Sequence, residues 1–402
     1  MIQPLSDITV IDASSYISGP FCTKYLADMG ATVIKVESPH GGDVSRRMSP
    51  FYQDTPSSDG SGVFLFMNAN KQGITLDFDT ATGRRIFREL IAKADVFVED
   101  FHPDYLPSLG LSYDDLAAIN DQLIVTSITP FGQTGPYIDM LGDEIVLLGM
   151  GGPMIHTGND NREPTKYAGN ISLRQAGVLS ALATSVAIMA MEARGTGEHV
   201  DVSVFEVLAG SQDRRTSLML AHQHVQEIFG RRTVGGTIAS GIFPCKNGYV
   251  NISGGGVRFA GVCSMIGQPE LLEDERFSPS ERLLEENAVV FNVLYLETWL
   301  AERTMLEVWQ AANKEHVLAG VIYTTKDLLD NKDFQDRGVW QEIDHPDTGP
   351  LLYPGRPYLM SESPWSMRRP APKLGQHNEE IYCGLLGYTK PDLVNLYQVG
   401  VI

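Results

Sequence analysis

Cysteine, basic residues and long apolar runs are all scarce in this sequence of 402 residues. The four cysteines lie far apart, and neither a C-x-x-C pair nor a His/Cys spacing typical of a metal site occurs. The longest strongly apolar stretch, residues 177–191, is shorter than the roughly 20 residues of a membrane span and contains small polar residues. These scarcities argue against a disulfide framework, a metal site and a membrane protein. We interpret the apolar stretch as a buried helix.

The deficit of basic residues leaves a strongly acidic chain. Lys and Arg total 31 against 50 for Asp and Glu, which gives a net charge of −19. Such a surface repels nucleic acid and anionic membranes, so neither is expected as a partner. The N-terminus enters a strand without a basic and apolar leader, and the cytoplasm is therefore the expected location.

Strands and helices alternate over the first 130 residues. Strand, helix and strand at this spacing form a βαβ unit, which predicts a parallel sheet and a doubly wound, Rossmann-like half. The expected elements are strand 8–14, helix 20–29, strand 31–37, helix 80–94, strand 95–99 and strand 123–128.

The later sequence predicts a second, smaller domain. Residues 142–170 are rich in Gly, Asn, Asp and Pro and are interpreted as loop, followed by a helix over 171–194 and a strand over 199–203. From about residue 225 the sequence pattern changes, and it predicts a hairpin followed by amphipathic helices. We therefore expect an α/β fold: a Rossmann-like large domain from 1–225, a smaller α+β domain over 226–325, and a segment 326–402 that rejoins the large domain.

Several polar side chains are candidates for a site, each with an ordinary structural alternative. Asp12 ends a strand and could be a general base, although a capping role is commoner there. His102 follows a strand whose carboxyl end would face a ligand. Lys71 could meet a phosphate or be a solvated lysine. Asp143 and Glu144 are adjacent, so their side chains point apart, which disfavours a shared acid–base role.

A series of motifs, in order along the whole chain, resembles the class III coenzyme A-transferases. They run from the opening segment to the last residues, and their number and order make the resemblance specific. The motifs are Val10-Ile11-Asp12, Ser18-Gly19-Pro20-Phe21, Val33-Ile34-Lys35-Val36-Glu37, Asn70-Lys71-Gln72, Val98-Glu99-Asp100-Phe101-His102-Pro103, Phe131-Gly132-Gln133-Thr134-Gly135-Pro136-Tyr137, Gly195-Thr196-Gly197 and Leu374-Gly375-Gln376-His377.

The resemblance implies a fold, an assembly and a reaction. The two chain ends would build the Rossmann-like domain, and two protomers would thread through each other as an interlocked dimer. The implied reaction moves CoA from a thioester donor, such as succinyl-CoA, to a carboxylic acid. In it an aspartate attacks the donor, which divides one difficult exchange into easier covalent steps. No permanently bound cofactor is implied, because CoA and its thioester are substrates.

The resemblance also implies contacts to CoA, and some of these positions depart from the family. Asp100 stands where asparagine is common, and Ser108 stands where arginine is common. The positions carried over are Ile17, Ser18, Lys71, Leu76, Phe78, Asp100, Phe101 and His102.

The largest departure concerns the nucleophile. The family aspartate lies four residues before the glycine of the apolar helix, here Gly177, and that position is Leu173. Residues 169–177 contain no Asp or Glu. A leucine can neither form an anhydride nor carry a proton, so no catalytic residue is predicted at this position.

Three functions remain open on these grounds. The first is the non-nucleophilic subunit of a heteromeric CoA-transferase, as in benzylsuccinate CoA-transferase, with a related partner that carries the aspartate. The second is a homodimeric transferase or acyl-CoA enzyme that uses another route, such as direct attack by the acceptor carboxylate or Asp143 or Glu144 as base. The third is a CoA-binding protein without catalysis. A nicotinamide dehydrogenase is disfavoured because no G-x-G-x-x-G follows the first strand.

Overall fold

The structure is a computed structural model, and it describes residues 3–158, 162–210 and 237–402. Its internal contacts divide the chain into two units. Met1–Met154, Lys166–Val225 and Asp336–Ile402 belong to the first, and Ile155–Thr165 with Gln226–Gln335 belong to the second. The boundary that we expected at 225/226 lies outside the described residues.

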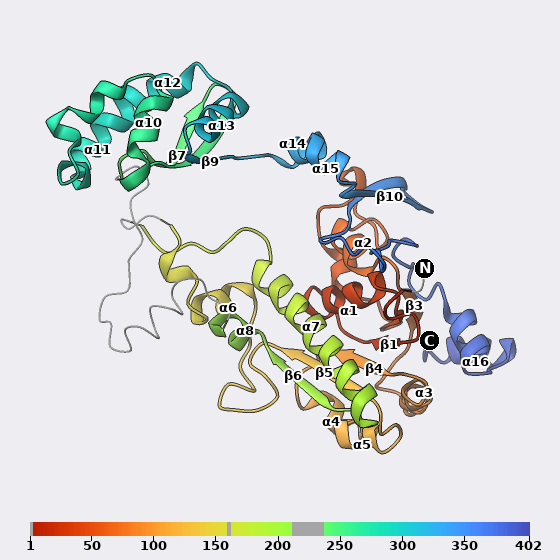
Figure 1. The fold of residues 1–402 in the computed structure, drawn as a ribbon. Coiled ribbons are helices and arrows are strands. Elements are labelled where there is room, and N and C mark those ends of the chain that lie inside the picture. Colours follow the sequence, from red (N-terminus) through yellow and green to blue (C-terminus); the bar gives the residue numbers. More distant parts are fainter. Residues whose placement is uncertain (1–2, 159–161, 211–236) are drawn as a thin grey trace. The chain divides into compact units, whose positions relative to one another are not determined.

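The first unit is built on a six-stranded parallel sheet (Figure 1). Its strand order is β3-β2-β1-β4-β5-β6, the order of a doubly wound Rossmann sheet, and every neighbouring pair is parallel. This confirms the predicted α/β fold. The strands are β1 (Thr9–Asp12), β2 (Thr32–Glu37), β3 (Gln72–Thr75), β4 (Val96–Glu99), β5 (Ile124–Thr129) and β6 (His199–Ser203).

Helices cover both faces of this sheet. Successive strand residues point to opposite faces, and both Val10 and Ile11 are fully buried, so neither face of the central strand is open to water. One face packs on α1, α7 and α8, and the other packs on α3, α5 and α16 (Figure 1). The helices of this unit are α1 (Ser18–Asp28), α2 (Gly62–Asn68), α3 (Ala81–Ile91), α4 (Tyr105–Ser108), α5 (Tyr113–Ala117), α6 (Glu144–Met150), α7 (Ile171–Arg194), α8 (Val204–Gly210) and α16 (Lys390–Gln398).

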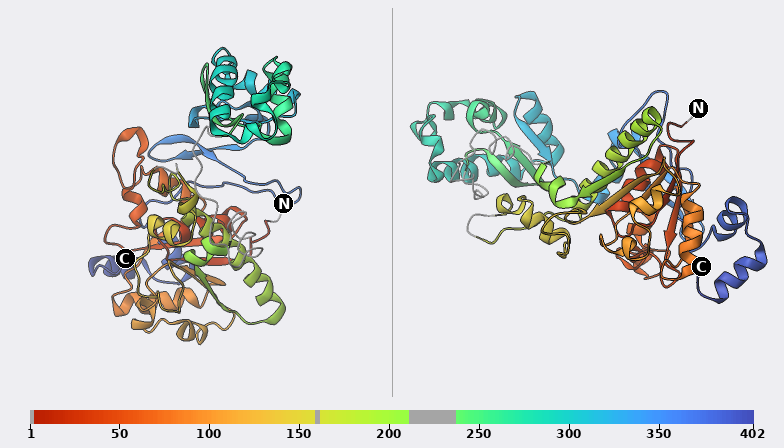
Figure 2. Two further views of the ribbon diagram at one scale, coloured as in Figure 1. Left: turned by 90° about the vertical axis from the view of Figure 1, so that its left-hand side faces the viewer. Right: turned by 90° about the horizontal axis from the view of Figure 1, so that it is seen from below.

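The C-terminal segment, which is blue in Figure 2, forms hydrogen bonds to the edge strand β3. His377 Nδ1 accepts a hydrogen bond from the Gly73 N–H at 3.0 Å, and Asn378 Oδ1 accepts from the Thr75 N–H at 2.9 Å. The Tyr382 hydroxyl donates to the Thr75 carbonyl at 2.6 Å. These bonds satisfy backbone groups that an open sheet edge would expose. Before them the chain forms an antiparallel hairpin of β10 (Trp340–His345) and β11 (Gly349–Pro354).

The second unit combines a small antiparallel sheet with short helices. The expected hairpin is confirmed as β7 (Ser240–Cys245) and β8 (Gly248–Ser253), and β9 (Leu318–Val321) pairs with β8. Its core is apolar, with Phe259, Phe277 and Phe291 in mutual ring contact. The helices are α10 (Phe259–Met265), α11 (Glu285–Phe291), α12 (Thr298–Ala301), α13 (Met305–Lys314), α14 (Thr325–Leu329) and α15 (Lys332–Asp336).

Short 3-10 and π turns complete the described secondary structure. The turns are η1 (Val44–Arg47), η2 (Tyr52–Asp54), η3 (Met154–His156), η4 (Gly256–Arg258), η5 (Pro269–Leu272), η6 (Glu275–Phe277), η7 (Glu281–Leu283), η8 (Asn292–Glu297) and η9 (Glu379–Leu385).

Helix α7 has the predicted bounds but is not fully buried. Gly195 ends it in the left-handed region at φ 75°, where a glycine is favoured. Its inner face carries small residues such as Gly177 and Ser180, whereas Leu182, Val186 and Met189 on the outer face are 56–69% exposed. The interpretation as a buried helix is therefore wrong for one face. By length and composition alone α7 could cross a membrane, but here its inner face packs on α1 and β5.

Helix α6 lies within residues 142–170, which we expected to be loop. Asp143 caps it by accepting a hydrogen bond from the Glu144 N–H at 2.7 Å. A seven-residue helix is marginal by itself, and burial of Leu147 and Leu148 against the first core stabilises this one.

Candidate functional site

The carboxyl ends of β1 to β5 bring most of the predicted site residues to one edge of the sheet. This edge is where doubly wound folds bind ligands. Three cavities open there among the described residues, and each takes some of the candidate side chains.

The first of them, the acidic cavity, has a volume of about 190 Å³. Leu76, Phe78 and Phe101, which the family resemblance assigns to CoA, all line it. Its walls also carry four carboxylates and one lysine, Lys35. The lining residues are Ala13, Ser14, Ser15, Lys35, Val36, Glu37, Ser38, Gly42, Asp43, Leu76, Asp77, Phe78, Asp79, Phe101 and Tyr105.

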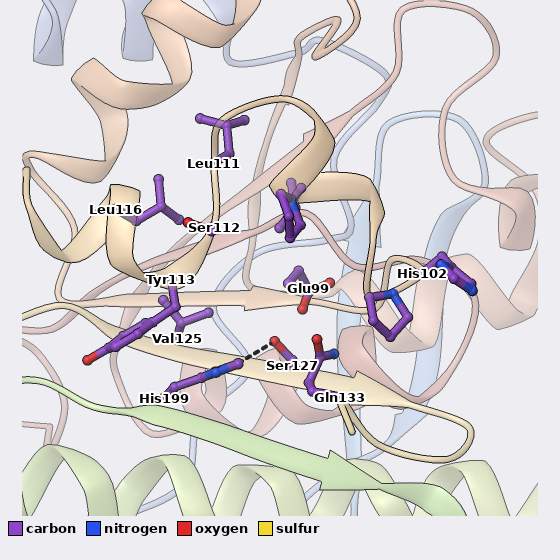
Figure 3. A pocket seen from close by; sticks show the side chains of 13 residues that line it. Glu99, His102, Leu111, Ser112, Tyr113, Leu116, Val125, Ser127, Gln133 and His199 are labelled. Atoms are coloured by element: carbon purple, nitrogen blue, oxygen red, sulfur yellow. Dashed lines mark hydrogen bonds between the residues drawn. The ribbon is translucent and has the colours of Figure 1, made fainter. Parts of the chain in front are cut away.

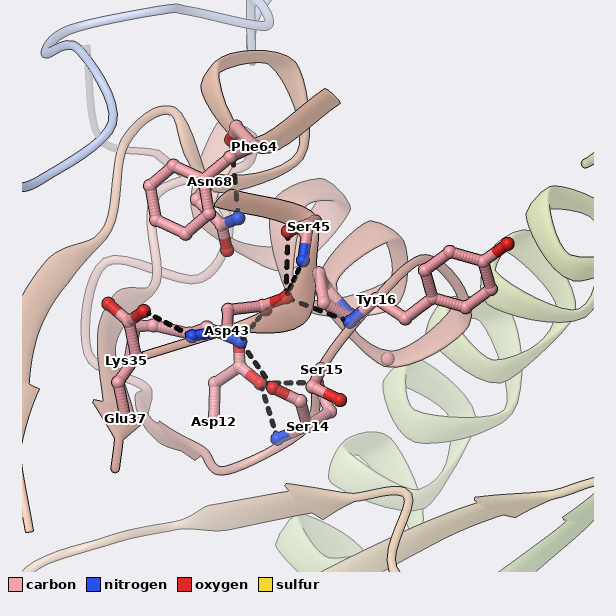
Figure 4. A network of polar contacts seen from close by, with 12 residues as sticks. Asp12, Ser14, Ser15, Tyr16, Lys35, Glu37, Asp43, Ser45, Phe64 and Asn68 are labelled. Carbon is pink, nitrogen blue, oxygen red and sulfur yellow. Dashed lines mark hydrogen bonds and ion pairs between the residues drawn. The ribbon is translucent and has the colours of Figure 1, made fainter. Parts of the chain in front are cut away.

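The Lys35 ammonium is engaged by other residues of the chain (Figure 4). Its Nζ lies 2.9 Å from Asp43 Oδ2 and also donates to the Ser14 carbonyl. Although burial opposes the charge, the carboxylates of Asp12, Asp43 and Glu37 raise the pKa of Lys35. Among the described residues that line the acidic cavity, no cation is therefore free to meet a phosphate.

The second cavity, the Leu173 cavity, has a volume of about 200 Å³ and shares Ser15 with the acidic cavity. Leu173 lies in the first turn of α7 and is 7% exposed. The lining residues are Ser15, Tyr16, Ser18, Asp100, Ile128, Thr129, Pro130, Gly142, Asp143, Leu147, Leu173 and Val204.

Asp100 lines the Leu173 cavity and accepts hydrogen bonds from Ser15, which lines both cavities. Both of its carboxylate oxygens accept from the Ser15 N–H, at 3.0 and 2.9 Å. Burial raises the pKa of this carboxyl well above its usual range, against the effect of the Ser15 hydrogen bond.

Asp143 and Glu144 differ in their surroundings, as their adjacency predicts. The Glu144 carboxylate is buried and accepts from the Ser172 N–H at 3.2 Å, from the Leu173 N–H at 3.3 Å and from the Ser172 hydroxyl. It therefore caps the N-terminus of α7, where backbone donors are otherwise unsatisfied. Asp143, in contrast, lines the Leu173 cavity.

Lys71 is enclosed in the protein interior and is not among the residues that line the cavities. Its Nζ lies 2.9 Å from each of Asp12 Oδ2, the Pro20 carbonyl and Asn68 Oδ1, and the side chain is fully buried. Burial and the charge of Lys35 lower the pKa of Lys71 to about 8, although Asp12 opposes the shift. The three donors of its ammonium are thus used inside the protein.

Asp12 is the partner that holds Lys71. It also accepts from the Thr23 hydroxyl at 2.7 Å and from the Ser14 backbone at 3.1 Å. Burial opposes its ionisation, but Lys35 and Lys71 keep the pKa of Asp12 well below its usual range. Asp12 therefore has a structural role, as a buried ion-pair partner at the end of β1 and not as the helix cap that we considered commoner. Ile17, beside it, is buried in the first core.

His102 belongs to a third cavity that the sequence did not suggest. This Glu99 cavity has a volume of about 100 Å³ and lies under α4 and α5 (Figure 3). Its polar residues include Glu99 at the carboxyl end of β4, Ser127 of β5 and His199, the first residue of β6. Position at the carboxyl end of a strand, which marked Asp12 and His102 in the sequence, is also the signal for Glu99, whereas His199 begins its strand and has no such signal.

Comparison with known proteins shows the family to which the chain belongs. A profile of CoA-transferase family III matches residues 5–378. The chain is 30% identical to succinyl-CoA:(R)-benzylsuccinate CoA-transferase subunit BbsE of Thauera aromatica, over 100% of this chain and 99% of that protein. It is 31% identical to succinyl-CoA–D-citramalate CoA-transferase of Chloroflexus aurantiacus, over 100% and 98% respectively.

Solved structures agree with these sequence relatives. A crystal structure of a CAIB/BAIF family protein from Brucella suis matches with a TM-score of 0.83 and 30% identity, over 96% of this chain and 100% of that chain. The chain therefore belongs to CoA-transferase family III, enzymes that move CoA between acyl-CoA thioesters and carboxylic acids.

Proposed function

We propose that this chain is the subunit of a heteromeric class III CoA-transferase that does not carry the attacking carboxylate. The donor would be an acyl-CoA such as succinyl-CoA, and the acceptor a carboxylic acid. Leu173 carries the proposal. It lies on the wall of a cavity at the ligand-binding edge of the sheet, at the position where the family resemblance puts the nucleophilic aspartate. A partner chain with that aspartate would complete the reaction.

Two further observations support a partner of related fold. One relative, from Thauera aromatica, is named as a subunit of its transferase. In addition, Val178, Leu182, Val186 and Met189 follow one another at helical spacing on the outer face of α7 and are all exposed. A second class III chain seated there would remove this apolar stripe from water, as in the interlocked dimer that the family resemblance implies.

The charge of the acidic cavity also favours a partner chain. CoA is a polyanion, and four carboxylates with one engaged lysine line the cavity that holds Leu76, Phe78 and Phe101. Like charges at close range disfavour such a ligand. Cationic groups from a partner chain would offset this charge. The CoA contacts at Ile17, Ser18, Lys71, Leu76, Phe78, Asp100, Phe101 and His102 remain predictions.

Covalent labelling tests the proposal directly. The chain is purified alone and together with a co-expressed family III relative that carries the aspartate, incubated with succinyl-CoA, and analysed by intact mass. We expect a CoA adduct and transfer activity only in the mixture, with the adduct on the partner. An adduct on this chain alone would contradict the proposal, and its absence from both chains would favour CoA binding without catalysis.

Restoring the carboxylate provides a second test. Leu173→Asp is expected to form the CoA adduct in this chain, because the added group faces the same cavity, whereas Leu173→Asn has nearly the same shape and should form none. Both variants are compared by intact mass and by circular dichroism. If both remain inert while folded, the cavity differs from a family active site in more than its nucleophile.

A homodimeric enzyme that uses Asp143 is the second candidate. Asp143 lines the Leu173 cavity, whereas both oxygens of Glu144 are occupied at the start of α7. Transfer activity of the chain alone that is lost in Asp143→Asn, but kept in Asp139→Asn, would establish this alternative in place of the first.

A further inference from the structure

Two polar residues that line the Glu99 cavity, Glu99 and Ser127, belong to a polar row that runs across three strands. Glu99 pairs in register with Ser127, and Ser127 pairs with Asp201, so the three side chains share one face of the sheet. Ser127 Oγ lies 2.9 Å from His199 Nε2 (Figure 3). The His199 ring stacks on Tyr113 at 5.3 Å between centroids and forms one side of the cavity.

Glu99 has no cationic partner in this arrangement. It is 4% exposed, and its Oε2 accepts a hydrogen bond from the Phe101 N–H at 2.7 Å. Burial raises the pKa of Glu99 to about 7, with a further contribution from Asp201, although hydrogen bonds from Ser127 and Phe101 oppose the shift. None of the described residues that line the cavity is a lysine or an arginine.

The remaining wall is apolar. Leu106 of α4, Leu111 and Leu116 of α5 line it, Val125 of β5 lies beside the polar row on the sheet, and all four are buried. A mostly apolar pocket with a few convergent polar groups is the usual form of a small-molecule site. Its volume of about 100 Å³ accommodates a molecule of about five to eight non-hydrogen atoms.

We propose that the Glu99 cavity binds a small primary ammonium ion with a short apolar tail. The ammonium would contact the Glu99 carboxylate and the Ser127 hydroxyl from the cavity, and the tail would lie against Leu106, Leu111 and Leu116. A cation supplies the charge that the buried carboxylate lacks, whereas Glu99 and Asp201 together repel an anion. The site is separate from the CoA chemistry of the Leu173 cavity.

Binding is then coupled to the ionisation of Glu99. The other titratable groups that face it are His199 and Asp201 on β6, Tyr113 on α5, and His102, whose Nε2 lies 3.9 Å from Asp139. Burial lowers the pKa of His199, although Asp201 opposes the shift, so at neutral pH this ring adds no competing positive charge. A bound ammonium should therefore release roughly one proton at pH 6 and little at pH 8.

Isothermal titration calorimetry of the full chain with n-butylammonium tests the proposal, with n-butanol and butyrate as neutral and anionic probes of similar shape. Each titration is run at pH 6 and pH 8 in buffers of low and high ionisation enthalpy. We expect butylammonium to bind with proton release at pH 6, and to bind at least tenfold more tightly than butanol or butyrate. Equal or tighter binding of butanol or butyrate would overturn the proposal, as would no measurable butylammonium binding.

Variants locate the site. Glu99→Gln should weaken butylammonium binding about tenfold or more and abolish the proton release, whereas Asp114→Asn, an exposed carboxylate on α5, should change neither. Ser127→Ala provides an independent variant if Glu99→Gln fails to fold, and it should weaken binding several-fold. Unchanged binding and proton release in the folded Glu99 or Ser127 variant would place the ammonium elsewhere and overturn the proposal.

Discussion

At the scale of single residues, ion pairs stabilise the buried charges of the first unit. Asp12, Lys35, Asp43 and Lys71 are all buried, yet each has an oppositely charged neighbour within 2.9 Å. Burial of a charge costs free energy unless a partner and hydrogen bonds compensate it. Glu99 lacks such a partner among the described residues, so folding should oppose its ionisation, as it does that of Asp100.

Glu99→Gln should therefore change how stability depends on pH. The folded-state pKa of Glu99 is raised to about 7 from 4.5, so stability is fully present below pH 4.5 and is lost as the pH rises through 7. Removing the charge should raise the free energy of unfolding at pH 8 by about 2–3 kcal/mol and leave it nearly unchanged at pH 4.5. Urea unfolding at both pH values measures the difference. The exposed control Glu192→Gln should show no such pH dependence.

Loss of Lys71 should destabilise the chain. Lys71→Met removes three hydrogen bonds and leaves the buried Asp12 carboxylate with a weaker counter-charge, for a cost of about 3 kcal/mol. Arg85→Met breaks the exposed pair with Glu89, and such pairs contribute about 0–1 kcal/mol. Urea unfolding at pH 7 compares the two variants. Equal effects would contradict the importance given to the buried network.

At the scale of elements, close contact between α1 and α7 holds one face of the sheet together. Gly177 allows this contact, because a Cβ at that position would come within 2.7 Å of the Ser18 carbonyl and 3.0 Å of Phe21 Cβ. Small residues on the inner face of α7 thus bring the helix onto α1 and β5, and its first turn, with Leu173, onto the cavity wall.

Gly177→Ala should force α1 and α7 apart. The backbone carbonyl of Ser18 cannot yield as a flexible side chain would, so we expect a loss of about 1–3 kcal/mol in the free energy of unfolding. Gly384→Ala is a suitable control, because a Cβ there meets no described atom within 4 Å. Thermal unfolding of both variants checks the result. A Gly177 variant as stable as the control would show that the two helices can adjust.

At the scale of the whole molecule, the exposed stripe on α7 bears on assembly. Leu182→Asp with Met189→Asp should abolish association with the partner chain, since two charges would replace the centre of an apolar contact. Val257→Asp changes a residue that is 94% exposed in the second unit and should leave association intact. Light scattering after size exclusion measures both. Association that survives the double change would place the interface on another surface.

Much of the fold could be predicted because buried parallel strands have continuous apolar sequences. Val33-Ile34 and the run over residues 123–128 predicted β2 and β5, and the bounds of α7 matched the structure. Strand β3, in contrast, is short and includes Gln72 and Gly73, and bonds from residues more than 300 positions away complete it. Such pairing leaves no local pattern, and the same is true of the cavity around Glu99.

The sequence by itself determined the parallel sheet, through its alternating apolar segments, and the family, through the order of its motifs. It also puts Leu173 at the position where the family resemblance implies an aspartate. The tertiary structure decided which charges are free to act. It enclosed Lys71 with Asp12, turned Glu144 to the start of α7, and left Asp143 and Leu173 on one cavity. It also placed Glu99 beside Ser127 and His199. The reason is physical: partners and burial set the protonation and reach of a side chain, and both arise from contacts between segments distant in sequence.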